Sequence, residues 1–554
     1  MGKPTLPQDI ILLICSELGA RREFTTLYRC STVSSRVSSI AVEQLYGILG
    51  VQDSFDFHTV QAVRFWRSII LSSLGATVYP YCAYIRPLSL GSLIDCLYDI
   101  RSDLALRQFF LEGQMQDFLV LQGDNKPVRS TRSRPPPFDI PRFASKCTDS
   151  IIQYIKGLAN SNGTSMALTH LEASASPPDT LLTWLSHLSN LRALQIQDGS
   201  VLGVEAARAI AECCPNFAEL ICFHCSGNTA AEDMAAFFLA LRPNTLQRFE
   251  VHSQNNLSEV TLAALSTHAE SLRVLDLRSL LASTVKSLHL LSQCTALEIL
   301  LIEREATDRT GLDIFNEEEL ERVTKWIGGC KALQELSLNR VRDALPILKQ
   351  VLQNPEIRLK QLSIQDYRPA SEEITKAAWG ALGQQDQLKL LTIGSPYGSV
   401  NDIALHRHPE LTDSICRLFN LTTLNLMQAS ASSTEIHRIA TALPRLEELS
   451  FGGGLVDDSI LEPLGKLSKL TTLSINAVTA FTFENLLSFA QILYQAGNRN
   501  IRVELFGQWY EAKLTEGEEM RLTEYFVDHL NGQIAITYPN DPDELHEADF
   551  SDSE

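Results

Sequence analysis

The sequence has no long apolar run and no excess of basic residues, and each absence removes a class of function. No stretch approaches the roughly 18 to 20 apolar residues of a membrane-spanning helix, and the first apolar run, 10–15, is too short for a secretory leader. Lysine and arginine total 47 against 66 aspartate and glutamate, giving a formal net charge of −19. Binding nucleic-acid phosphates requires clustered cations. We therefore expect neither a membrane nor a nucleic acid as a partner.

Motifs for catalysis and cofactor binding are also absent from the sequence. It contains no G-x-S-x-G motif, no phosphate-cradling glycine loop and no paired His/Cys nucleophile pattern. The 12 cysteines follow no secretory signal, so we expect reduced thiols and a cytoplasmic or nuclear location. We predict that the chain is not an enzyme and holds no cofactor.

One cysteine cluster has the residue types of a zinc site. Cys222 and Cys225 flank His224, with two further cysteines upstream at 213 and 214. The repeat pattern described next gives both Cys222 and Cys225 a structural position, so we predict core thiols and no metal. Likewise, the glycines at 452–454 follow a repeat strand and are interpreted as its turn.

A motif of the form apolar-x-x-apolar-x-apolar recurs along the chain. Its copies begin at Leu168, Leu191, Phe217, Leu246, Leu272, Leu297, Leu333, Leu359, Leu388, Leu421, Leu446 and Leu470, with an early copy at Ile85 and a degraded one at Ile501. Most steps are about 24 to 29 residues, which is the period of leucine-rich repeats. Helical patterns lie between the copies, at 204–213, 232–241, 260–268, 317–327, 374–382 and 436–443.

A short strand followed by a helix in each repeat predicts an α/β solenoid, with parallel strands inside and helices outside. The irregular, helix-bearing repeats resemble the ribonuclease-inhibitor-like subtype of leucine-rich repeat, and we expect a helix over 518–530 to cap the far end. The predicted domains are three short helices in 1–50, a linker with a first irregular repeat in 51–121, a flexible basic Pro/Arg-rich loop in 122–146, the solenoid with its cap in 147–537, and a disordered acidic tail in 538–554.

The first of these domains carries an apolar pattern, and its three short helices are too small to bury a hydrophobic core alone. Its members are Leu6, Pro7, Ile10, Ile11, Ile14, Leu18, Leu27 and Val33. Ile10, Ile11, Ile14 and Leu18 fall at helical spacing, and an apolar stripe on so small a segment needs another surface to cover it. With Ser34 and Arg36, this pattern resembles the F-box, the adaptor-binding module of cullin–RING ubiquitin ligases. The alternative from the residues alone is an amphipathic helical cap on the solenoid.

The resemblance implies a substrate-recognition subunit of an SCF-type E3 ubiquitin ligase. In that family the F-box binds a Skp-type adaptor, through which cullin and RING subunits are joined, and the repeats hold a protein substrate. It implies that the residues of the apolar pattern contact the adaptor. A stand-alone leucine-rich-repeat scaffold or inhibitor is the alternative function.

Strand alternation predicts that positions three, five, seven and eight of each motif face the concave surface. Between 217 and 340 these positions are charged or aromatic, whereas after 388 they are small and neutral. We therefore predict substrate contacts at Phe223, His224, Arg248, Glu250, Asp276, Arg278, Glu303, Arg304 and Arg340. Phe223, Arg278 and Arg340 are the preferred anchors, because arginine and aromatic side chains dominate protein interfaces.

Overall fold

A computed structural model describes residues 6–47, 59–121, 139–173, 178–306, 315–368, 370–394, 403–508 and 513–538. The chain divides into two compact units, Met1–Ser271 and Leu272–Glu554, which are described separately. The predicted acidic tail from 539 onward lies outside the described residues, as does the predicted basic loop up to 138. The rest of that loop is not irregular, because it enters a helix at Ile140.

Unit 1 begins with a three-helix bundle formed by α1 (Gln8–Ala20), α2 (Phe24–Ser31) and α3 (Ser35–Gly47). Contrary to the expectation from its length, the bundle has a small core of its own, made of Ile11, Cys15, Leu27, Ile40 and Ala41. Tyr46 joins α3 to the helices that follow, because its ring stacks on Tyr81 at 4.7 Å and on Phe65 at 5.5 Å.

The described part of the predicted linker and first irregular repeat, 59–121, is mainly helical. Its helices, with one that follows, are α4 (Thr59–Ser73), α5 (Tyr81–Tyr84), α6 (Leu90–Ser102), α7 (Leu104–Leu111), η1 (Gly113–Phe118) and α8 (Ile140–Asn162). The early copy of the motif, which begins at Ile85, is confirmed as a repeat strand. It forms β1 (Pro87–Ser89), in which Leu88 aligns with Leu171 of the next copy.

The strands of unit 1 pair in parallel in chain order. They are β1, β2 (His170–Glu172), β3 (Ala193–Asp198), β4 (Glu219–His224) and β5 (Arg248–Val251). The helices between them are α9 (Pro178–Leu185), η2 (Gly199–Val201), α10 (Val204–Cys213), α11 (Ala230–Ala240), α12 (Glu259–Leu265) and η3 (Ser266–His268). The fourth motif position is buried in each repeat, which fixes the register of the sheet and confirms the predicted period.

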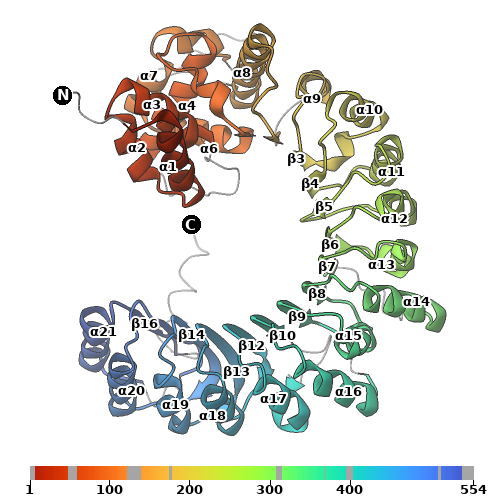
Figure 1. The fold of residues 1–554 in the computed structure, drawn as a ribbon. Helices are drawn as coiled ribbons and strands as arrows, with labels where there is room; N and C mark the ends of the chain where they lie inside the picture. Colours follow the sequence, from red (N-terminus) through yellow and green to blue (C-terminus); the bar gives the residue numbers. More distant parts are fainter. Residues whose placement is uncertain are drawn as a thin grey trace, which may run out of the picture. The chain divides into compact units, whose positions relative to one another are not determined.

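Unit 2 repeats the same plan. Its strands are β6 (Val274–Leu280), β7 (Ile299–Arg304), β8 (Glu335–Asn339), β9 (Gln361–Gln365), β10 (Leu390–Ile393), β11 (Ile403–Ala404), β12 (Thr423–Ser430), β13 (Glu448–Val456), β14 (Thr472–Thr479), β15 (Arg502–Leu505) and β16 (Gln533–Ile536). Its helices are α13 (Ala282–Lys286), η4 (Ser287–Leu291), α14 (Glu317–Gly328), α15 (Ala344–Gln353), α16 (Glu372–Leu382), η5 (Leu405–Arg407), α17 (Pro409–Ile415), α18 (Ser433–Ala442), η6 (Asp458–Ile460), α19 (Leu461–Gly465), α20 (Phe483–Gln495) and α21 (Glu516–Leu530). Within this unit the strands lie along one side and helices α14–α20 along the other (Figure 1).

The fold is the predicted α/β leucine-rich-repeat solenoid preceded by a small helical domain, and it differs from the prediction in two places in unit 2. The capping helix α21 is followed by one more parallel strand, β16, which pairs with β15. Residues 452–454 lie inside β13 and do not form its turn, because β12, β13 and β14 are longer than the other strands of the unit.

Candidate functional site

The apolar residues of α1 divide into an inward and an outward stripe. Ile11 and Cys15 are buried in the core of the bundle, and Leu18 packs against them. A helix turns about 100° per residue, so Ile10 and Leu13 point about 100° and about 160° away from the direction of Ile11, while Ile14 lies at the border of the two sides, about 60° from Ile11. The side of α1 that faces α2 and α3 is therefore buried. The helix has a second apolar side that the bundle does not bury.

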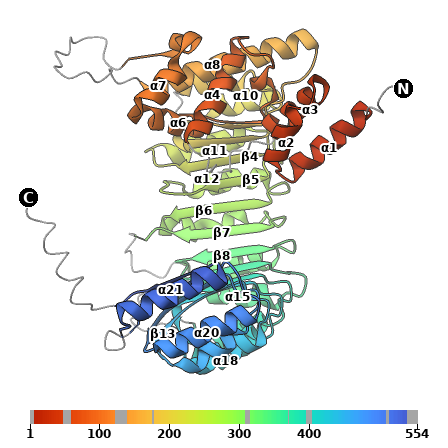
Figure 2. The same cartoon turned by 90° about the vertical axis from the view of Figure 1, so that its left-hand side faces the viewer.

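The outward stripe consists of Ile10, Leu13 and Ile14, of which Leu13 is 64% and Ile14 45% exposed. Leu6, just before the helix, is also exposed. Figure 2 shows α1 at the margin of the bundle, with α2 and α3 on one side of it. We call Ile10, Leu13 and Ile14 the α1 stripe.

The structure corrects the predicted set of adaptor contacts. Leu6, Pro7, Ile10, Ile14 and Val33 are accessible, and Val33 is 71% exposed. Ile11 and Leu27 are core residues and Leu18 supports them, so these three hold the bundle together and do not present a surface. The sequence analysis missed the exposed Leu12, Leu13 and Tyr28. The unbroken apolar run at 10–14 was the available signal, since such a run must place residues on more than one face of a helix.

The charged strand residues of unit 1 form a compact network. The carboxylate of Glu250 accepts a hydrogen bond of 2.6 Å from Nε of Arg248 and lies 2.7 Å from Nε2 of His252. Burial alone would raise the pKa of Glu250, but the hydrogen bonds from His252 and Arg248, with their charges, outweigh it and hold that pKa below its ordinary value. Phe223, by contrast, is 51% exposed beside His224, whose Nδ1 lies 3.5 Å from Asp198.

Unit 2 shows the same pairing along its strands. Arg278 donates to both carboxylate oxygens of Asp276, at 3.0 and 2.8 Å, and Arg340 pairs with Glu303. Three predicted contacts are contradicted by burial. The side chain of Arg304 has no exposed surface, and the carboxylates of Glu250 and Asp276 lie almost fully buried beneath their arginines. The arginine heads above these carboxylates stay partly exposed, at Arg248 in unit 1 and at Arg278 and Arg340 in unit 2.

We expect the Glu250 network to stabilise unit 1 at neutral pH and to be lost in acid. Because the pKa of Glu250 is lower in the folded chain than in the unfolded chain, its contribution is complete above the ordinary glutamate value and disappears as the pH falls through the folded value. Glu250→Gln should cost on the order of 1 kcal/mol at pH 7, with two donors left weakly paired. Thermal unfolding measured from pH 7 to pH 3 should show the difference in stability between the wild type and Glu250→Gln becoming smaller as the pH falls. A difference that stays constant over this range would contradict the network.

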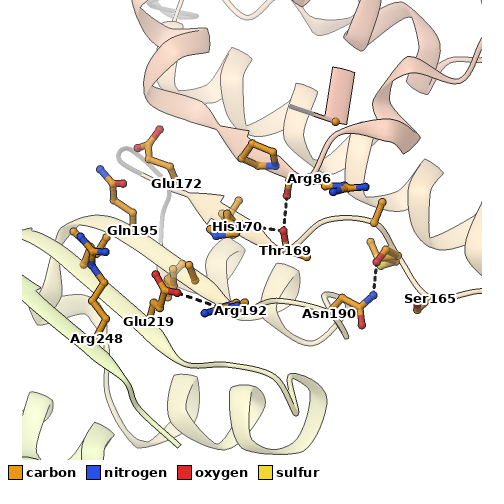
Figure 3. A pocket seen from close by; sticks show the side chains of 18 of the residues that line it. Arg86, Ser165, Thr169, His170, Glu172, Asn190, Arg192, Gln195, Glu219 and Arg248 are labelled. Atoms are coloured by element: carbon orange, nitrogen blue, oxygen red, sulfur yellow. Dashed lines mark hydrogen bonds and ion pairs between the residues drawn. The ribbon is translucent and has the colours of Figure 1, made fainter. Parts of the chain in front are cut away.

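A groove of about 790 Å³ opens beside the first strands of unit 1 (Figure 3). Arg22 and Gly47 line it from the bundle, and the remaining residues come from β1 to β5 and the segments before them. Polar and charged side chains converge on it in the close-up, and the labelled ones are Arg86, Ser165, Thr169, His170, Glu172, Asn190, Arg192, Gln195, Glu219 and Arg248. Sequence reasoning missed it because the lining is spread over five copies of the motif and the segments before them.

Local bonding sets the chemistry of this groove. Glu172 is buried and accepts hydrogen bonds from the hydroxyl of Ser89, at 2.7 Å, and from the first turn of α6. Nε of Arg192 lies 3.1 Å from Glu219, and burial lowers the pKa of His170, which keeps that ring neutral at pH 7. The groove thus offers arginine heads and neutral donors, an arrangement suited to polar recognition.

The cysteine cluster is part of the repeat core, as predicted. Cys222 and Cys225 have no exposed surface, and burial raises the pKa of Cys225 to about 12. A thiol with such a pKa is not a thiolate at neutral pH, and the thiolate is the form that reacts with alkylating reagents.

We therefore predict selective thiol labelling of the native protein. The half-buried Cys30, Cys213 and Cys416 should react with iodoacetamide before the others, while Cys222 and Cys225 should react only after denaturation. Peptide mass spectrometry after a labelling time course measures this, and elemental analysis of the same sample should find no stoichiometric zinc. Rapid native labelling of Cys225 would contradict its burial.

None of the helices in the described segments is both long and apolar enough to cross a bilayer. Neither a scan of protein-family models nor a search of curated proteins finds a match to this chain. Among solved structures, yeast Rad7 in complex with Elc1 aligns over 86% of this chain and 95% of that chain, with 16% identity and a TM-score of 0.39. An internalin, inlF, from Listeria monocytogenes aligns over 58% of this chain and 82% of that one, with 15% identity and a TM-score of 0.34. A TLR13–ssRNA13 complex aligns over 62% of this chain and 43% of that chain, with 16% identity and a TM-score of 0.31.

Proposed function

We propose that this protein is the non-catalytic substrate-recognition subunit of an SCF-type E3 ubiquitin ligase. The three-helix bundle α1–α3 docks a Skp-type adaptor, which brings the cullin and RING subunits, and the repeats bind a protein substrate. The observation that carries the proposal is the α1 stripe, which is apolar, exposed and not used by the core of the bundle.

The energetics favour a protein partner on this stripe. Burying each of these side chains contributes roughly 1.5 to 3 kcal/mol, so three together supply a substantial part of a specific interaction. Single exposed apolar residues need no explanation, but here Leu6, Ile10, Leu13 and Ile14 follow one another along one short segment. The resemblance to the F-box lies in the same segment, and in that family the segment binds a Skp-type adaptor.

The repeats suit the second half of the proposal. A parallel sheet with helices on one side leaves its other face free for a ligand, and the strands hold their side chains rigidly. In unit 1, Phe223 and the groove beside β1 to β5 offer an aromatic anchor and arginine heads on that face. These are the groups in which protein interfaces concentrate binding energy.

The test is co-purification with a Skp-type adaptor. Leu13→Asp with Ile14→Asp should reduce adaptor capture at least about tenfold, because two charges would enter an apolar contact. The helix should persist, since both side chains are exposed. The matched control is Leu239→Asp with Val260→Asp, on α11 and α12 of the same unit, where Leu239 is also 64% exposed.

Undiminished capture by the Leu13/Ile14 variant, with loss only in the control, would contradict adaptor docking through α1. Capture of no adaptor by the wild type would favour the stand-alone scaffold or inhibitor. One observation suits that alternative: α3 is fixed to α4 and α5 through Tyr46, as a terminal cap would be.

A further inference from the structure

Unit 2 carries a basic groove along the edge where its strands begin. The groove encloses about 500 Å³, and its charged lining residues are Lys360, Lys389, Arg445, Lys469 and Glu447. We propose that it binds an extended acidic segment of a protein partner. The inference is independent of adaptor docking, because every residue it uses lies in unit 2.

The strand register brings these cations to one edge in a staggered row, in which Glu447 holds the position before β13 that Lys360 and Lys389 hold before β9 and β10. Lys360 immediately precedes β9 and Lys389 immediately precedes β10, while Arg445 and Lys469 lie shortly before β13 and β14. The strands β9, β10, β12, β13 and β14 are successive neighbours in the sheet. With about 4.8 Å between neighbours, the row extends over about 19 Å.

The four cations have no carboxylate partner among the described residues. Lys360 donates to the amide oxygen of Gln334 at 2.6 Å, and Arg445 to that of Asn420 at 2.6 Å, so their hydrogen bonds go to neutral groups. Several exposed cations elsewhere in unit 2 are paired with carboxylates, among them Lys331, Arg368, Lys376, Arg438 and Lys466.

The groove therefore brings several positive charges together in one place. It holds four cations and one carboxylate, in a chain whose net charge is −19. Like charges held together in one concave site raise the local potential and attract anions. A ligand with several negative charges would relieve this repulsion along the whole row.

The shape of the row favours a peptide with repeated carboxylates. An extended chain advances about 3.3 Å per residue, so a segment of about six residues spans the row, with alternate side chains facing it. Asn420 and Thr422 in the groove can bond to the peptide backbone. No aromatic residue is found among the described residues that line it, and single-stranded nucleic acid requires such stacking platforms.

The experiment measures fluorescence anisotropy of a labelled peptide of alternating glutamate and serine with the full-length protein. Lys360→Glu, Lys389→Glu and Lys469→Glu together form the groove variant. Lys331→Glu, Lys376→Glu and Lys466→Glu together form the control, which changes the net charge equally at exposed positions where ion pairs contribute little. A serine-only peptide and a labelled oligouridylate are the comparison ligands.

We expect the groove variant to bind the acidic peptide at least about tenfold more weakly than the wild type, and the control variant to stay within about twofold. Binding should also weaken with added salt. Equal binding by wild type and groove variant, equal losses in both variants, tighter binding of oligouridylate, or no binding of the acidic peptide would each overturn the inference. Adaptor capture by the groove variant should equal that of the wild type, which separates this test from that of the proposed function.

Discussion

Gly453→Ala is expected to destabilise unit 2 by about 3 kcal/mol, at the upper end of the range for an overpacked site. A methyl group at position 453 would lie against the carbonyl oxygen of Ala431, and one at position 452 against that of Met427. Both obstacles are backbone atoms of β12 or its end, so no side-chain rotation relieves them. The close approach arises because β12 shifts register between Leu426 and Ser430 where it pairs with β13.

Gly454→Ala supplies a control one residue away. Nothing lies within 4 Å of a methyl group built at position 454, so this variant should unfold at nearly the wild-type temperature. Thermal unfolding monitored by circular dichroism, together with hydrogen exchange of β12 and β13, measures both variants. Similar stability of the Gly453 and Gly454 variants would show that the strands do not meet as closely as described.

The repeat period made the fold predictable from sequence, whereas the extension of β12 to β14 was not. Leucine spacing fixes which residues are buried and therefore fixes the register, as the alignment of Leu391, Leu424, Leu449 and Leu473 shows. The run of three glycines at 452–454 indicated a turn by composition. Its two constrained members instead permit close backbone approach inside a sheet, which depends on the path of the neighbouring strand and is invisible in the local sequence.

The sequence indicated which side chains share a strand or a helix, but not which of them the fold buries. Alternation correctly placed Arg248 and Glu250 on one strand face, yet the same alternation brings them into contact, and the carboxylate becomes a buried support for the arginine. The apolar pattern at the amino terminus likewise contains both buried and exposed residues. Sequence spacing alone did not separate Ile11, which packs inward, from Ile14, which faces outward.

Leu27→Ala is expected to unfold the three-helix bundle and so abolish adaptor docking without affecting the repeats. Leu27 has no exposed surface and belongs to a core of only a few side chains. Truncating a buried leucine costs about 2 to 5 kcal/mol, which is a large part of the stability of a domain this small. Hydrogen exchange should show loss of protection in α1, α2 and α3, with β3 to β5 unchanged.

Leu12→Ala removes the same atoms from an exposed position on α1 and should leave the bundle protected, because Leu12 is 44% exposed and outside the core. Together with the Leu13/Ile14 variant, these changes separate two causes of lost docking. Leu27→Ala should lose protection and adaptor capture together, whereas Leu13→Asp with Ile14→Asp should lose capture alone. If Leu27→Ala unfolds the bundle and adaptor capture persists, the adaptor binds elsewhere on the chain and the role proposed for α1 is wrong.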